Sequence, residues 1–262
     1  MQIIEALVLG LLQGVTEFIP VSSSGHLVLA EQLFNFEVSG FVFDAVLNLG
    51  TIAALVIYFR QDLGRMIKGV FSGGHDRRLA WLVILGTLPA VIAGIFLQSF
   101  TESAFRSTYV VAAALVIVAL VMLIIEKVAK FTRPLVQMKP ADSLAIGLIQ
   151  VAAFIPGVSR SGATITAGMA RGLKREAAAR FSFLLSIPVL LGGTIKVLLE
   201  PTAWEQVTSK PLLFTVGILA AFASGYLAVS WLLRYLAANR LTPFAYYRIG
   251  LAAIILLVTL LS

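Results

Sequence analysis

Two short segments combine serine, glycine and ionisable side chains within an otherwise apolar chain. The first carries Glu17 and, beyond a proline, Ser22, Ser23, Ser24, Gly25 and His26. The second carries Ser159, Arg160, Ser161, Gly162 and Thr164. Arginine presents a planar fork of donors that grips two phosphate oxygens. The serines of each segment are candidate N-caps of a following helix, and the beginning of a helix directs backbone N–H groups and the positive end of its dipole toward an anion. These residue types predict a site for a phosphate-like anion.

Phosphoryl chemistry also needs a group that activates the nucleophile, or a metal ion that offsets negative charge. Glu17 follows Gln13 by four residues, so both side chains are expected on one helix face. Their oxygens suit Mg²⁺ or Ca²⁺, and a cation would give the buried Glu17 carboxylate a partner. His26 is a candidate base for Ser23 or a water molecule, or a nucleophile that would itself form a phosphohistidine. The side chains expected around the anion are Ser22, Ser159, Arg160, Ser161 and Thr164.

The elements that position these residues belong to a membrane protein. Of the 262 residues, 59% are hydrophobic and 13% are charged, whereas soluble domains have about 45–50% and about 25%. The chain has no cysteine, which excludes disulfides, thiol catalysis and cysteine-bound metals. The net charge of +7 is interpreted as a record of membrane topology, so no nucleic-acid partner is expected.

Six stretches are long and apolar enough to cross the ~30 Å hydrocarbon core as helices. They cover about 41–59, 79–98, 108–125, 177–199, 212–233 and 243–261. Four other apolar stretches form two pairs, each broken by a proline and a serine cluster, at about 3–19 with 25–36 and 142–155 with 162–172. Each pair is predicted to enter the membrane and turn back. Asp44 and Asn48 are expected to support the site, and Arg248 is expected to extend toward the membrane surface.

An internal repeat relates the two broken pairs. The matching residues are Gly10, Gln13, Phe18, Ile19 and Pro20 with Gly147, Gln150, Phe154, Ile155 and Pro156, followed by the two serine clusters. Each copy precedes three spans, and because three is odd, the second copy must be inverted relative to the first. Basic residues gather in 60–78, 126–141 and 171–176, which places these segments inside.

The predicted fold is therefore an all-α integral membrane protein with an inverted repeat, six transmembrane helices and two re-entrant helical hairpins. A single membrane domain is expected over 1–262, with repeat halves of about 1–130 and 140–262.

The two motifs, from Gln13 to His26 and from Pro156 to Thr164, closely resemble those of the undecaprenyl-diphosphate phosphatase family, also called the bacitracin resistance protein. The resemblance covers essentially the whole chain. It implies a multi-pass enzyme of the bacterial cytoplasmic (inner) membrane that hydrolyses undecaprenyl diphosphate to undecaprenyl phosphate and inorganic phosphate. Such an enzyme recycles the lipid carrier for cell-wall peptidoglycan synthesis and confers bacitracin resistance. The resemblance also implies dependence on a divalent metal and a homodimer.

The family motifs can be carried over by position. The glutamate motif falls on Gln13 and Glu17, the serine–histidine motif on Ser22, Ser23 and His26, and the arginine motif on Ser159, Arg160, Ser161 and Thr164. Many relatives have glutamate where this chain has Gln13, which can bind a metal through its oxygen but cannot act as a base. The candidate catalytic residues are thus Glu17, Ser23, His26 and Arg160.

A transporter or flippase that binds a polyprenyl phosphate or another anion without hydrolysis is the alternative. Inverted repeats with broken helices alone would favour it. A binding site needs Arg160 but has no need of an acid and a histidine beside it, so Glu17 and His26 favour hydrolysis.

Overall fold

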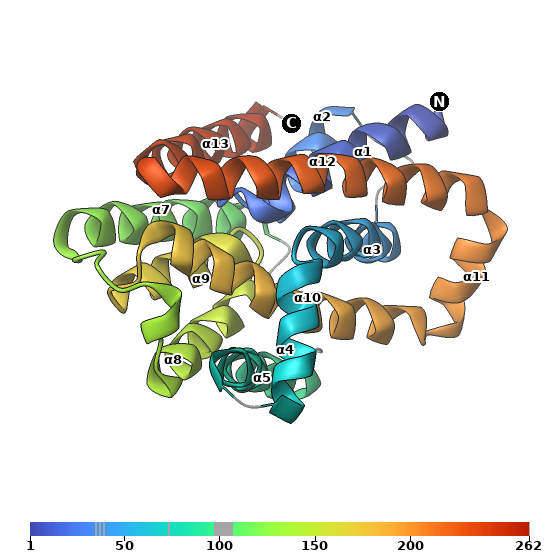
Figure 1. Cartoon of the computed structure of the whole chain (residues 1–262). Helices are drawn as coiled ribbons and strands as arrows, with labels where there is room; N and C mark the ends of the chain where they lie inside the picture. Colours follow the sequence, from blue (N-terminus) through green and yellow to red (C-terminus); the bar gives the residue numbers. More distant parts are fainter. Residues whose placement is uncertain (35, 37, 39, 73, 97–106, 262) are drawn as a thin grey trace.

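The computed structural model describes residues 1–34, 36, 38, 40–72, 74–96 and 107–261. Within these ranges all the regular elements are helices, joined by turns and irregular segments, and one isolated parallel bridge links Arg133 with Leu173 (Figure 1). The helices are α1 (Gln2–Phe18), α2 (Ser23–Phe34), α3 (Phe41–Tyr58), α4 (Arg60–Ser72), α5 (Gly74–Phe96), α7 (Thr108–Val128), η1 (Leu135–Gln137), α8 (Pro140–Val151), η2 (Ala152–Phe154), α9 (Arg160–Ala170), α10 (Arg175–Leu198), α11 (Pro201–Ser209), α12 (Pro211–Ala238) and α13 (Thr242–Leu261). The predicted all-α class is confirmed.

Six helices in the described part of the chain are long and apolar enough to cross a membrane. They are α3, the portion Asp76–Phe96 of α5, α7, α10, α12 and α13, which match the six predicted ranges to within a few residues. Residues 97 and 98, at the end of the second predicted range, lie outside the described residues. Two connections also contain helices that the sequence did not predict, α4 and α11. The prediction of six spans is confirmed.

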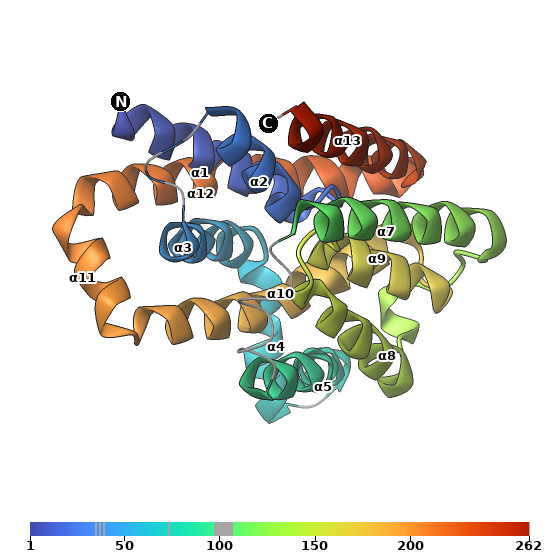
Figure 2. The same ribbon diagram turned by 180° about the vertical axis from the view of Figure 1, so that it is seen from behind.

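The two predicted breaks, residues 19–22 and residues 155–159, each begin where a proline restricts the residue before it to extended backbone. The helix α1 ends at Phe18, and Ile19, which precedes Pro20, has φ −65° and ψ 133°. In the second break Ile155, which precedes Pro156, has φ −80° and ψ 118°. The chain then turns and begins a new helix, α2 or α9. Figure 2 shows both helix pairs, α1 with α2 and α8 with α9, joined near the centre of the molecule.

Helices of each half pack against helices of the other half, and they do so in equivalent pairs. The first helix of each half packs along the middle span of the other, α1 on α12 and α8 on α5. Both pairs approach closely at glycines: a Cβ on Gly10 would lie 2.4 Å from the carbonyl oxygen of Gly217, and one on Gly147 would lie 2.3 Å from that of Gly86. Likewise α3 packs on α12 and α10 packs on α5. This exchange agrees with the predicted repeat, and it brings the two breaks together.

Candidate active site

The two breaks have the same backbone conformation at a serine and the same helix cap. Ser22 and Ser159 have φ of 76° and 67°, in the left-handed region that serine rarely adopts. The Oγ of Ser22 accepts a hydrogen bond from the N–H of Gly25 at 3.3 Å, and the Oγ of Ser159 accepts one from Gly162 at 3.1 Å. Each serine therefore caps the helix that follows it, as predicted.

Two hydrogen bonds join the breaks to each other. Ser161 Oγ donates to the carbonyl oxygen of Ile19 at 3.5 Å, and the N–H of Gly157 donates to Ser24 Oγ at 3.0 Å. The beginnings of α2 and α9 consequently lie side by side. The first amides of any helix lack intrahelical partners, so two such sets meet at this junction. This arrangement suits an anion.

Glu17 lies at the centre of the junction and uses both carboxylate oxygens. Its Oε1 accepts a hydrogen bond from Arg160 Nη2 at 3.1 Å, in an ion pair whose side chains are 10% and 8% exposed. Its Oε2 accepts hydrogen bonds from Ser23 Oγ at 2.9 Å and from Gln13 Nε2 at 3.1 Å. The sequence interpretation gave Glu17 a metal ion as its partner. The structure supplies Arg160, which reaches across from the other half.

Arg160 keeps donors beyond the one that binds Glu17. Its Nη1 lies 3.4 Å from the carbonyl oxygen of Ser182, and its Nε is buried without a hydrogen-bond partner among the described residues. Thr164 Oγ1 donates to the Arg160 carbonyl at 2.7 Å and lies 2.6 Å from Ser182 Oγ. The guanidinium is thus held by Glu17 and the Ser182 carbonyl oxygen, while its Nε–H has no partner among the described residues and can bind an anion.

His26 contacts other groups than those expected. Its Nδ1 lies 2.7 Å from the carbonyl oxygen of Ser22, which can only accept, so Nδ1 carries a hydrogen. Its Nε2 lies 2.8 Å from the hydroxyl of Tyr247, and the two rings stack at 5.6 Å. Within the described residues no hydrogen bond joins His26 to Ser23. The base in direct contact with Ser23 is Glu17.

Four other residues predicted to contact the anion, here called the framing residues, use their hydroxyl groups mainly to stabilise the backbone of the breaks: Ser22, Ser159, Ser161 and Thr164. Ser22, Ser161 and Thr164 have no exposed surface, and their hydroxyls form the internal hydrogen bonds described above. Ser159 is 9% exposed and caps α9. Ser23 is only partly buried. Direct contact of the four framing residues with an anion stays a prediction, whereas Ser23 has both a partner and an accessible surface.

Gln13 provides the observation that bears on a metal ion. Its Nε2 donates to Glu17 and, at 2.9 Å, to Asn48 Oδ1, so Asn48 holds the supporting place expected for it. Its Oε1 is buried with no hydrogen-bond partner in the described part of the chain. Among those residues, no three or more His, Cys, Asp or Glu side chains lie close enough together to hold a metal ion. Gln13 Oε1 and Glu17 fit Mg²⁺, which commonly takes one or two protein oxygens and completes its shell with phosphate and water.

Arg248 contradicts the expectation that it extends toward the membrane surface. It is fully buried, and its Nη2 donates to the carbonyl oxygens of Gly157 at 2.9 Å and Val158 at 3.0 Å. Its Nη1 donates to the Pro20 carbonyl at 3.4 Å and its Nε to that of Leu115 at 3.3 Å. The prediction was wrong because position along a span does not reveal which way a side chain points. Arg248 links the two breaks.

Sequence reasoning missed Tyr247 and Ser182 as neighbours of the site. The signal available for Tyr247 and Arg248 was their place inside an apolar span, because polar groups at membrane depth usually serve a function. No comparable signal marked Ser182, a common residue within a long helix.

Together, the fold and the site define a multi-pass membrane protein with a buried carboxylate–serine–arginine centre where two broken helix pairs meet. The family model described as "Bacitracin resistance protein BacA" matches residues 6–254, and the chain belongs to this family. A protein of Myxococcus xanthus named undecaprenyl-diphosphatase is 45% identical over 98% of this chain and 89% of its own length. Proteins with the same name from Rubrobacter xylanophilus and Alteromonas mediterranea are 42% and 41% identical, over 100% of both chains and 98% of both chains respectively.

Proposed function

We propose that this protein hydrolyses undecaprenyl diphosphate to undecaprenyl phosphate and inorganic phosphate in the bacterial cytoplasmic membrane. The observation that carries the proposal is the double contact of Glu17, which accepts a hydrogen bond from Ser23 at 2.9 Å and one from Arg160 at 3.1 Å. An anion carrier needs the arginine alone. A hydroxyl held on a carboxylate beside an arginine is the arrangement that hydrolysis needs.

Substrate binding uses the positive groups of the junction. The diphosphate lies against the first amides of α2 and α9, and Arg160 binds its oxygens through the donors that do not bind Glu17. The polyprenyl chain extends between the spans into lipid. Because negative charge grows on the phosphoryl oxygens during the reaction, donors fixed in a buried site lower the barrier.

Bond making begins at Ser23. Its Oγ attacks the terminal phosphorus while Glu17 Oε2 accepts the hydroxyl proton, and the bond from that phosphorus to the bridging oxygen breaks. Undecaprenyl phosphate leaves with the bridging oxygen and its electron pair. Water then attacks the phosphorus of the phosphoserine and gives a proton to a second acceptor, which later releases it to solvent. The bond from phosphorus to Ser23 Oγ breaks, inorganic phosphate leaves, and Glu17 returns to Oγ the proton that it accepted in the first step. We assign the second proton acceptor to His26 Nε2, since Nδ1 is committed to the Ser22 carbonyl.

Gln13 Oε1 and Glu17 would hold a divalent cation, Mg²⁺ or Ca²⁺. When bound, the cation adds positive charge beside the phosphate oxygens. The support for this part of the proposal is the buried, unpartnered amide oxygen of Gln13.

The test is release of phosphate by purified protein in detergent with undecaprenyl diphosphate and Mg²⁺. Phosphate release by the unmodified protein that is lost in Glu17→Gln supports the proposal that the protein is a hydrolase. Saturable binding of the lipid with no phosphate release would refute it and favour a carrier. Light scattering on the same preparation tests the homodimer that the resemblance implies, and growth of cells in bacitracin tests the proposed resistance.

A further inference from the structure

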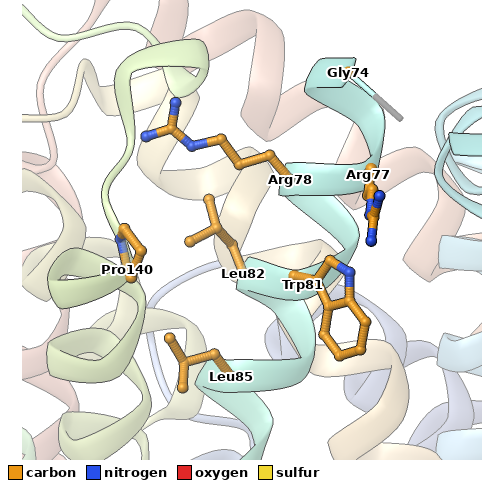
Figure 3. Close-up of a pocket in the computed structure, with 7 residues that line it drawn as sticks. All are labelled: Gly74, Arg77, Arg78, Trp81, Leu82, Leu85 and Pro140. Carbon is orange, nitrogen blue, oxygen red and sulfur yellow. The ribbon is translucent and has the colours of Figure 1, made fainter. Parts of the chain in front are cut away.

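A hollow of about 310 Å³ lies between the beginning of α5 and the beginning of α8, apart from the residues of the candidate active site (Figure 3). Leu82 and Leu85 project from α5 toward Pro140, which begins α8, so the walls are apolar. Arg77 and Arg78 border the same hollow. It therefore combines an apolar interior with a cationic rim.

The two arginines have unused capacity for an anion. Arg78 reaches across the hollow toward the chain before Pro140, and its Nη2 donates to the Met138 carbonyl oxygen at 2.9 Å (Figure 3). This hydrogen bond uses one of the five donors of the guanidinium. Arg77 is exposed. Among the residues that the structure describes, neither arginine forms an ion pair, and both side chains are exposed.

The position of the hollow indicates which anion would bind. Arg77, Arg78 and Trp81 lie at the start of the span Asp76–Phe96, and Trp81 is 54% exposed. Tryptophan at the end of a span is typical of the boundary between lipid and water. A ligand there would place its charged group at the arginines and its chains along the leucines. Anionic phospholipids have this form, and basic pockets between transmembrane helices bind their head groups.

We propose that this hollow binds an anionic glycerophospholipid of the leaflet that adjoins segment 60–78. The lipid phosphate contacts Arg77 and Arg78, and the upper part of one acyl chain lies along Leu82 and Leu85 beside Trp81. The site is independent of the proposed hydrolysis, because none of its residues belongs to the junction of the breaks.

Trp81 provides a direct readout. The chain has three tryptophans, so Trp204→Phe with Trp231→Phe leaves Trp81 as the single emitter in the full chain. This double variant, the parent of the experiment, is placed in two kinds of phosphatidylcholine nanodisc. One contains a small fraction of phosphatidylglycerol with brominated acyl chains, and the other contains the same fraction of phosphatidylcholine with brominated acyl chains. We expect brominated phosphatidylglycerol to quench Trp81 more strongly than brominated phosphatidylcholine. The ratio of the two quenching effects measures the preference for the anionic lipid. Arg77→Gln with Arg78→Gln should lower this preference by about five-fold per arginine, given ~1 kcal/mol per basic residue near the surface.

A matched control removes two charges elsewhere. Lys127 and Lys130 are exposed and are not among the residues that line the hollow, so Lys127→Gln with Lys130→Gln should keep the preference. Arg77→Gln alone leaves the bond of Arg78 to Met138 in place and should still lower the preference. Unchanged phosphate release verifies that each variant is folded. Equal quenching by both lipids in the parent, relief of quenching by inorganic phosphate, or loss of the preference in the lysine control would overturn the proposal.

Discussion

Arg160 binds Glu17 across the junction of the two halves, with Nη2 3.1 Å from Oε1, although the two residues are 143 positions apart in the chain. Ser23 binds the other oxygen of the same carboxylate at 2.9 Å. Ser23 and Arg160 are equivalent in the two repeats, since each follows the capping serine of its break. The first half thus supplies the carboxylate and the hydroxyl, and the second supplies the cation. Neither half holds a complete site.

The ion pair between Glu17 and Arg160 should show strong coupling in stability. Either Glu17→Gln or Arg160→Met leaves one charge buried without its partner, which costs roughly 3–5 kcal/mol. The double variant leaves no such charge and should be less destabilised than the sum of the two. Denaturant unfolding in detergent measures all four proteins, and additive losses would mean that the pair is not coupled.

Kinetics should rank the residues around the carboxylate. Ser23→Ala is expected to lower kcat by at least about 10²-fold, because the proposed nucleophile is lost. Arg160→Ala should lower kcat at least as much as His26→Ala, because the leaving phosphate needs little protonation and charge neutralisation dominates. Phosphate release measures these values, and Ser209→Ala, an exposed serine on α11, is the control. A dispensable Arg160 beside an essential His26 would contradict the ranking.

The sequence predicted the parts of this fold that depend on local physics. Hydropathy alone identified the six spans, and Pro20 and Pro156 marked the breaks because a proline restricts the residue before it. The serines that cap α2 and α9 were predictable from residue type.

Contacts between distant segments were not predictable in the same way. The bond of Glu17 to Arg160 depends on how two hairpins dock, and a single sequence holds no measure of that distance. Tyr247 and Arg248 belong to the last span, yet they touch His26 and the carbonyls of Gly157 and Val158. Periodicity in an apolar helix could not show that Arg248 faces inward, since lipid-facing and buried positions are both apolar here.

The close approach of α8 and α5 predicts a sensitive glycine. Gly147→Ala should destabilise the protein by about 1–3 kcal/mol, because the added methyl group meets the backbone of Gly86, which cannot rotate away. A Cβ on Gly192 of α10 would have no described atom within 4 Å, so Gly192→Ala should change stability by less than about 1 kcal/mol. Melting temperatures of both variants in detergent provide the comparison. Equal changes of melting temperature in the two variants would show that α8 and α5 can move apart without a loss of stability.

Asp142 should make stability depend on pH. Burial opposes its ionisation, but hydrogen bonds from Arg133, the Lys139 N–H and Arg171 outweigh burial and hold its pKa below the ordinary value. A lowered pKa in the folded state gives stability that is present above the unfolded pKa of ~3.9 and is lost as pH falls through the folded pKa. Asp142→Asn should therefore cost about 2 kcal/mol at neutral pH and less in acid. Melting temperatures of both proteins across pH test this, and a constant difference would contradict it.

Arg248 should act on catalysis through the geometry of the breaks. Its donors hold the carbonyls of Pro20, Gly157 and Val158, which belong to both breaks, so its loss should let the beginnings of α2 and α9 separate. A lysine carries its donors on one atom and cannot span these carbonyls. Misplacement of reacting groups by about 1 Å can cost about 10²-fold in rate. We expect Arg248→Lys and Arg248→Met to lower kcat at least about tenfold. Arg234→Met is the matched control, because Arg234 is exposed and its hydrogen bonds to described residues stay within its own helix, at Ser230. If kcat in the Arg248 variants merely followed their melting temperatures, the residue would serve folding alone; a loss of kcat in Arg248→Lys at nearly unchanged melting temperature would establish that it positions the site.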